Sequence, residues 1–156
     1  MEAIDKAIYY LNIKPRTRKQ VIDYLEKKEY PSDEIKQVIE SLEEYHYIDD
    51  ENYCRLYFEM GFEKGRGIAR IKRELAEKGV EKALIDQVLE EMDSVPDQYE
   101  MALELGQSLL HEFRYDAAEE YTYEDKQKLR AKLSRRLASR GYPADIVYKV
   151  ARNLID

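Results

Sequence analysis

The stretch GRGIARIKRELAEKGVEKALIDQVLEEM, residues 65–92, decides the fold of this chain. Apolar residues recur at Ile68, Ile71 and Leu75, which is the spacing of one helix face, and a second apolar stripe follows. Between the two stripes lies Gly79, a residue suited to the left-handed conformation that closes many helices. The stretch therefore predicts two amphipathic helices joined by a tight turn.

The same pattern occurs three times, anchored on Leu25, Leu75 and Leu137. Five further columns align at fixed distances from each leucine: Val21, Ile71 and Leu133; Glu29, Gly79 and Gly141; Tyr30, Val80 and Tyr142; Val38, Val88 and Val150; and Leu42, Met92 and Leu154. Self-similarity of this kind indicates stacked supersecondary units. A further amphipathic helix precedes each pair, and no segment shows the period of two that would predict a strand.

The predicted fold class is therefore all-α, with three tandem three-helix repeats at residues 1–48, 49–93 and 97–156. Asp49 and Asp50 stand where the first helix of the second repeat begins, and both can cap its free N–H groups. The third repeat has extra chain before its second helix, which is either a longer first helix or a loop, and we favour a longer first helix ending near Tyr121. Three such repeats in a row predict an elongated, curved array.

Composition excludes several classes of protein. The 156 residues include 26 basic and 33 acidic residues, for a net charge of -7, so the overall field does not favour duplex DNA. No apolar run is long enough to span a bilayer, and the start of the chain does not have the pattern of a signal peptide. A single cysteine, Cys54, excludes an internal disulfide and is typical of the reducing cytoplasm.

Basic residues nevertheless recur at aligned positions of the second and third repeats. Arg66, Arg70 and Arg73 align with Lys128, Lys132 and Arg135, and their spacing predicts a narrow arc of each helix, opposite the apolar stripe. Residues 126–140 contain no acidic residue at all, whereas the first repeat lacks the stripe. A solvated helix face is the ordinary explanation. The recurrence, and the missing acidic residues at i, i+4 spacing, favour an anionic ligand instead.

Residues 47–89 resemble the signature of the RecX family, regulators of the bacterial recombinase RecA. The motifs that carry the resemblance are Ile48-Asp49-Asp50, Tyr57-Phe58, Gly67, Ile71-Lys72-Arg73-Glu74-Leu75 and Lys78-Gly79-Val80. The third repeat is similar to the C-terminal repeat of the family, and the first repeat is similar more weakly. The chain departs from the family pattern at Cys54, where alanine is frequent, and at Glu59, Met60 and Phe62, where more basic residues are expected.

The resemblance implies an all-α protein that binds the RecA filament on single-stranded DNA. Such a protein lies in the filament groove and reduces ATP hydrolysis and strand exchange, thereby regulating DNA repair and recombination. The partner-binding residues expected from the stripe are Arg66, Arg70, Lys72, Arg73, Lys128, Lys132, Arg135 and Arg136. We expect a cytoplasmic monomer with weak direct DNA contact and no membrane association.

The sequence offers no catalytic or cofactor-binding pattern, and we expect neither an enzyme nor a cofactor. His46 and His111 lack partners at metal-ligand spacing, and Cys54 lies near an apolar face. Two other functions stay open. One is a direct DNA-binding regulator built of helix-turn-helix-like repeats, which duplex DNA affinity would reveal. The other is a helical scaffold for a different protein, which would act independently of RecA.

Overall fold

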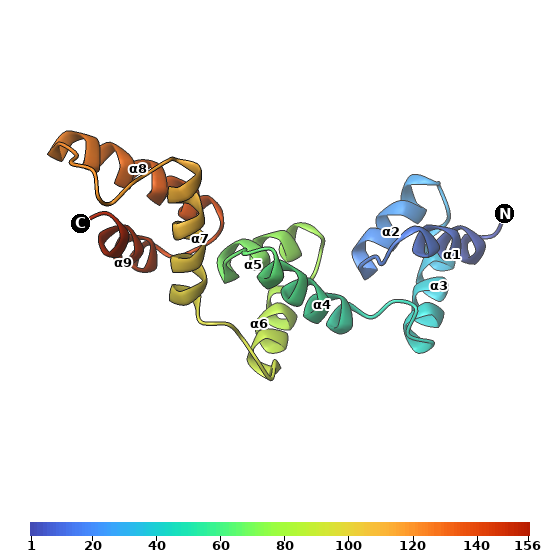
Figure 1. Cartoon of the computed structure of the whole chain (residues 1–156). Helices are drawn as coiled ribbons and strands as arrows, with labels where there is room; N and C mark the ends of the chain where they lie inside the picture. The colour runs from blue at the N-terminus through green and yellow to red at the C-terminus, as the bar shows by residue number, and fades with distance from the viewer. The chain divides into compact units, whose positions relative to one another are not determined.

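The computed structural model describes residues 1–156 and contains nine α-helices and no strands (Figure 1). The helices are α1 (Ala3–Ile13), α2 (Arg18–Lys27), α3 (Ser32–Glu44), α4 (Asp50–Glu63), α5 (Ile68–Glu77), α6 (Lys82–Glu91), α7 (Gln98–Glu112), α8 (Tyr123–Ser139) and α9 (Ala144–Leu154). They follow one another in three sets of three. The all-α fold with tandem three-helix repeats is therefore confirmed.

The turn between the second and third helix of each repeat has the same backbone conformation. Its residue with positive φ is Glu29 in the first repeat (φ 66°), Gly79 in the second (φ 93°) and Gly141 in the third (φ 98°). Pro31 and Pro143 each stand immediately before the helix that follows, in an extended conformation. The glycines and prolines thus end one helix and start the next.

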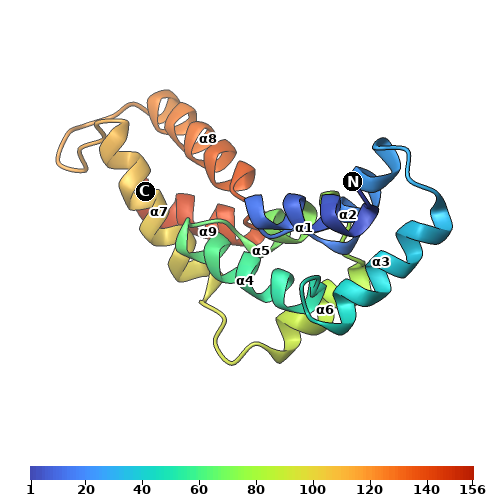
Figure 2. The same cartoon turned by 90° about the vertical axis from the view of Figure 1, so that its right-hand side faces the viewer.

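The longer first helix predicted for the third repeat is wrong. Helix α7 ends at Glu112, and residues 113–122 form a loop before α8 begins at Tyr123 (Figure 2). Arg114 has φ 60°, a left-handed conformation that stops the helix. The Thr122 hydroxyl accepts a hydrogen bond from the Asp125 N–H at 3.0 Å and caps α8. The added residues therefore lengthen the loop and the second helix.

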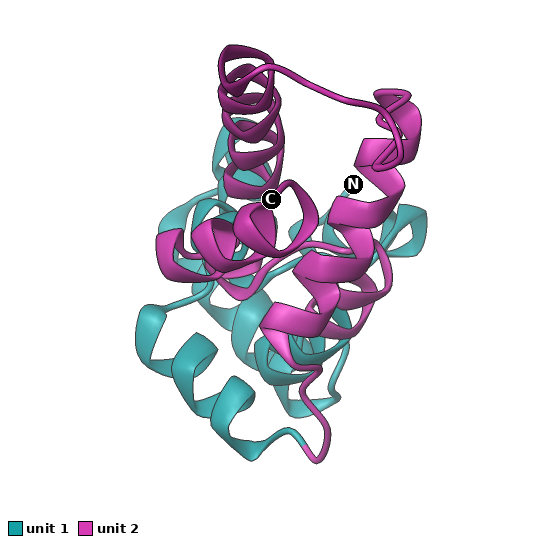
Figure 3. Cartoon of the chain, turned by 60° about the vertical axis from the view of Figure 1, so that its left-hand side comes forward, with its two compact units in different colours: residues 1–57, 73–92 teal, residues 58–72, 93–156 magenta.

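The chain divides into two compact units (Figure 3). Unit 1 contains residues 1–57 and 73–92, and unit 2 contains residues 58–72 and 93–156. Each unit therefore combines a complete terminal repeat with part of the middle repeat, and α4 and α5 each contribute residues to both units. Two of the boundaries between the units, after Tyr57 and after Lys72, therefore lie inside the middle repeat.

Each unit has its own apolar core. In unit 1 the core joins α1, α2 and α3 through Ala3, Ala7, Val21, Leu25, Ile35, Val38, Ile39, Leu42 and Ile48. In unit 2 it joins α7, α8 and α9 through Ala102, Leu109, Leu110, Leu133, Leu137, Tyr142, Val147, Val150, Ala151 and Ile155. Gly106 lets α7 and α9 approach closely, because a Cβ there would lie 2.9 Å from Leu154 Cδ1. The apolar columns of the sequence repeat thus form the cores.

In unit 1, the start of α2 docks on the turn between α5 and α6. The buried hydroxyl of Thr17 donates to the carbonyl oxygen of Lys78 at 2.6 Å. The next backbone N–H, of Arg18, donates to Asp50 Oδ1 at 2.8 Å. A Cβ on Gly79 would lie 2.5 Å from Lys19 Cβ, so only glycine fits this close approach.

In unit 2, the start of α5 docks on the turn between α8 and α9 in the corresponding way. The Gly67 N–H donates to the carbonyl oxygen of Arg140 at 2.7 Å. The next N–H, of Ile68, donates to Gln98 Oε1 at 2.9 Å. A Cβ on Gly141 would lie 2.4 Å from Arg70 Cβ.

These two contacts are equivalent within the repeat. In both contacts, the residue just before the second helix of one repeat donates a hydrogen bond to a carbonyl oxygen of the next repeat, that of the residue before its turn glycine. The backbone N–H of the following residue then donates to the side chain of the first helical residue of that next repeat. Asp50 and Gln98 are those first side chains, at the starts of α4 and α7. Asp49 caps α4, with its Oδ1 accepting from the Asn52 N–H, whereas Asp50 serves the contact between repeats. We call this arrangement the repeat junction.

Candidate partner-binding surface

The negative charge of the chain is unevenly distributed. Unit 1 contains 19 acidic and 12 basic residues, a net charge of -7, whereas unit 2 contains 14 of each. Within unit 2, residues 126–140 contribute seven basic residues and no acidic one. An anionic partner would therefore meet least repulsion on the third repeat.

Part of the α8 charge is engaged by Glu124 at the start of α8 and by residues of neighbouring elements, contrary to the expectation from sequence. Lys128 Nζ lies 3.9 Å from the carboxylate of Glu124, and Arg136 Nη2 lies 3.6 Å from Glu112 of α7. Lys132 Nζ lies 4.1 Å from the ring centroid of Phe113, a cation–π distance. Both acidic partners lie outside residues 126–140, so the absence of acidic residues within that segment did not reveal them. Both ion pairs are largely exposed and contribute little stability.

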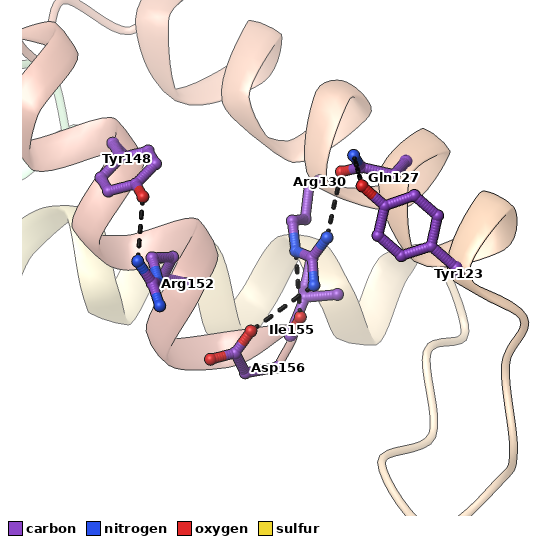
Figure 4. A network of polar contacts seen from close by, with 7 residues as sticks. All are labelled: Tyr123, Gln127, Arg130, Tyr148, Arg152, Ile155 and Asp156. Carbon is purple, nitrogen blue, oxygen red and sulfur yellow. Dashed lines mark hydrogen bonds and ion pairs between the residues drawn. The ribbon is translucent and has the colours of Figure 1, made fainter.

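Arg130 is anchored at the end of α9 and does not serve as a free cation (Figure 4). Its Nε donates to the carbonyl oxygen of Ile155 at 3.1 Å, and its Nη2 lies 3.5 Å from Asp156. Its Nη1 donates to Gln127, whose amide donates in turn to the Tyr123 hydroxyl. Arg130 therefore ties α8 to α9.

The structure separates the predicted basic residues around α5. Arg66 precedes the helix, so its predicted place on the α5 arc is wrong, and its guanidinium lies 4.0 Å from the Met60 sulfur. Helix α5 starts at Ile68, and Gly67 immediately before it uses its N–H in the repeat junction. Arg70 is half-buried where Gly141 packs against it, and Lys72 is half-buried too.

Arg73 and Arg135 stand out among the eight predicted residues. They occupy equivalent positions in the second and third repeats, on α5 and α8. Both side chains are exposed, and neither makes a hydrogen bond or ion pair within the chain. Arg73 belongs to unit 1, and Arg135 to unit 2 with Lys128, Lys132 and Arg136. Lys128, Lys132 and Arg135 lie within a narrow arc of α8, as their spacing predicts.

The remaining polar chemistry is structural. Cys54 is buried, and burial raises the pKa of its thiol to about 11, which suppresses the reactive thiolate. Burial also raises the pKa of Asp50, opposed by the hydrogen bond from the Arg18 backbone. No cluster of three or more histidine, cysteine or acidic residues could hold a metal ion. None of the helices combines the length and the apolar character needed to cross a bilayer.

Comparison with known proteins identifies the family. Residues 3–42 match the model of the first three-helix domain of RecX, and residues 49–89 match its second three-helix domain. Regulatory protein RecX of Streptomyces lividans is 33% identical over 144 residues, which span 91% of this chain and 71% of the relative. The chain belongs to the RecX family. The resemblance seen in residues 47–89 is thereby confirmed.

Other RecX proteins give the same result. Regulatory protein RecX of Clostridium botulinum (strain Eklund 17B / Type B) is 35% identical over 141 residues, 90% of this chain and 63% of the relative. The chain thus spans less than two thirds of that relative's length. The crystal structure of RecX from Lactobacillus salivarius superposes with a TM-score of 0.76 at 25% identity, covering 97% of this chain and 94% of that one. The three-helix repeats are therefore those of a family of regulatory proteins.

Proposed function

We propose that this chain binds the RecA filament on single-stranded DNA, lies in its groove, and reduces ATP hydrolysis and strand exchange. Membership of a family of regulatory proteins supports a regulatory role. The observation that supports an anionic partner is that Arg73 and Arg135 are exposed and unpaired within the chain. Arg73 and Arg135 are exposed at equivalent positions of successive repeats, so each of these two repeats offers one unpaired guanidinium group to an anionic partner.

The acidic unit 1 gives the proposal its specificity. A net charge of -7 on unit 1 disfavours binding to bare DNA, whereas unit 2 presents its basic helix. We therefore infer that a surface offering both protein and phosphate groups binds better than DNA alone. We also propose that the chain acts by binding rather than catalysis, as a monomer, in the cytoplasm.

The test is ATP hydrolysis by RecA on single-stranded DNA, with this chain titrated in well below the RecA concentration. We expect inhibition at low ratio together with weak binding to bare DNA at the same salt concentration. Unchanged hydrolysis, combined with tight and salt-sensitive binding to duplex DNA, would replace the proposal with the DNA-regulator function. The first turns of two third helices disfavour that function, because the first turn of α3 contains Asp33 and Glu34 and that of α9 contains Asp145.

A double variant tests the two arginines. Arg73→Glu with Arg135→Glu should weaken filament binding roughly tenfold, because each reversal places a carboxylate beside an anionic partner. The melting temperature should hardly change, since neither side chain has a partner within the chain. The matched control is Lys14→Glu with Lys36→Glu, two exposed positions of the first repeat that change the net charge equally. An equal loss of filament affinity in both double variants would mean that net charge alone, rather than Arg73 and Arg135, determines binding.

A further inference from the structure

A shallow groove runs between α8 and α9 in the third repeat. Its lining includes the small side chains of Ala138 and Ala144, the buried Val147 and Tyr142, and the exposed Tyr148. Its volume of about 430 Å³ falls in the range of small-ligand sites, roughly 300–1,000 Å³. No acidic residue lines it. The groove is therefore apolar, open and free of negative charge.

The ring of Tyr148 is held in place although it is exposed. Its side chain is 60% exposed, and its hydroxyl accepts a hydrogen bond from Arg152 Nη1 at 3.0 Å (Figure 4). The same guanidinium lies 5.7 Å from the ring centroid. Arg152 thereby restricts the ring, so less conformational entropy is lost when a second planar group stacks on it. More than half of the Tyr148 side chain stays exposed in the folded chain, so a stacked group would bury additional apolar surface.

Positive charge lies on the α8 side of the groove. Arg135 lines it, is exposed, and has no partner within the chain. The base of the groove also connects to the repeat junction of unit 2, because the Tyr142 hydroxyl donates to the Gly65 carbonyl oxygen at 2.7 Å. A ligand that combines a planar apolar group with an anion would match both features.

We propose that this groove binds one base of single-stranded DNA, stacked on Tyr148, with the adjoining phosphate beside Arg135. The inference rests on the proposed function and deepens it, since it names the part of the filament that the third repeat contacts. An apolar peptide would leave Arg135 without a counter-charge, and a bare phosphate would leave the exposed ring of Tyr148 without a stacking partner. A nucleotide satisfies the groove and the arginine together.

The test uses the full chain and two fluorescent oligonucleotides of equal length at low ionic strength. One is oligothymidylate, and the other is an abasic strand with the same phosphates. By anisotropy we expect tighter binding to oligothymidylate. Tyr148→Ala should lower that affinity about fivefold or more while leaving abasic binding unchanged, because stacking of one base is lost. Tyr148→Phe keeps the ring and should retain most of the affinity.

A matched control removes an equally exposed tyrosine. Tyr9 of α1 is also 60% exposed, and Tyr9→Ala should leave both affinities unchanged. The inference is overturned if the unaltered chain binds both strands equally or neither, or if Tyr148→Ala behaves like Tyr9→Ala. RecA ATP hydrolysis separates this inference from the proposed function. If the chain inhibits RecA ATP hydrolysis but binds both oligonucleotides equally, only the groove site is refuted. If the chain prefers oligothymidylate but does not inhibit hydrolysis, the groove site is supported and the filament function is refuted.

Discussion

Gly141→Ala should disrupt the repeat junction of unit 2. The added Cβ would lie 2.4 Å from Arg70 Cβ and 2.6 Å from the Arg70 backbone nitrogen, so the turn must move away from α5. That movement would stretch the hydrogen bond from the Gly67 N–H to Arg140 and the one from the Tyr142 hydroxyl to Gly65. The substitution therefore perturbs both packing and hydrogen bonding at one point.

Three contributions set the expected size of the effect. A left-handed alanine costs roughly 1–2 kcal/mol, since Gly141 has φ 98°. Overpacking against backbone costs about 1–3 kcal/mol. Weakening the junction hydrogen bond costs roughly 0.5–1.5 kcal/mol. We expect a total loss of about 4 kcal/mol in the free energy of unfolding, measured by urea denaturation followed by circular dichroism.

Gly65→Ala is the matched control within the same unit. Gly65 also has positive φ, 77°, but its added Cβ would meet no atom within 4 Å. Only the left-handed strain applies, so the loss should be about 1–2 kcal/mol. The two variants should then differ in melting temperature by roughly 6–12 °C. Equal stabilities for the two variants would refute the close docking of the α8–α9 turn on α5.

Two further predictions concern buried side chains of unit 1. Thr17→Val should destabilise the chain by about 2–3 kcal/mol in urea denaturation, because it leaves the Lys78 carbonyl unsatisfied and removes the α2 cap, whereas Thr17→Ser should cost about 1 kcal/mol. Equal losses for the two would contradict the role of the hydroxyl. The Cys54 thiol, whose pKa burial raises from 9.0 to about 11, should react with a disulfide reagent at pH 8 only at the rate of unfolding. The stability that its neutral form contributes is complete below pH 9 and is lost as the pH rises through about 11, which thermal melts across that range would measure.

Much of the fold could be predicted because its determinants are local. Helical periodicity around Leu75 and the glycines at the turns depend only on residues a few positions apart, and the structure confirms them. The loop of residues 113–122 could not be predicted in the same way. Its sequence is compatible with helix, and the left-handed Arg114 that ends α7 has no glycine to mark it.

The candidate surface could be predicted only as a set of basic residues. Spacing placed Lys128, Lys132 and Arg135 on one arc of α8, and it failed for Arg66, because the α5 helix starts after Gly67. A signal for the failure exists in the sequence, since glycines flank Arg66 on both sides. Tyr148 carried no such signal, because its exposure depends on the packing of α9 against α8.

The sequence by itself determined the existence of the helices, their threefold repetition and the glycine turns at Gly79 and Gly141. These features follow from backbone conformation and from apolar spacing along a single helix. Only the tertiary structure decided which charges are engaged. Arg130 binds the end of α9, Arg136 lies beside Glu112, and Arg135 stays unpaired. Electrostatic partners depend on distance through space, and residues far apart in sequence meet only after the helices have packed.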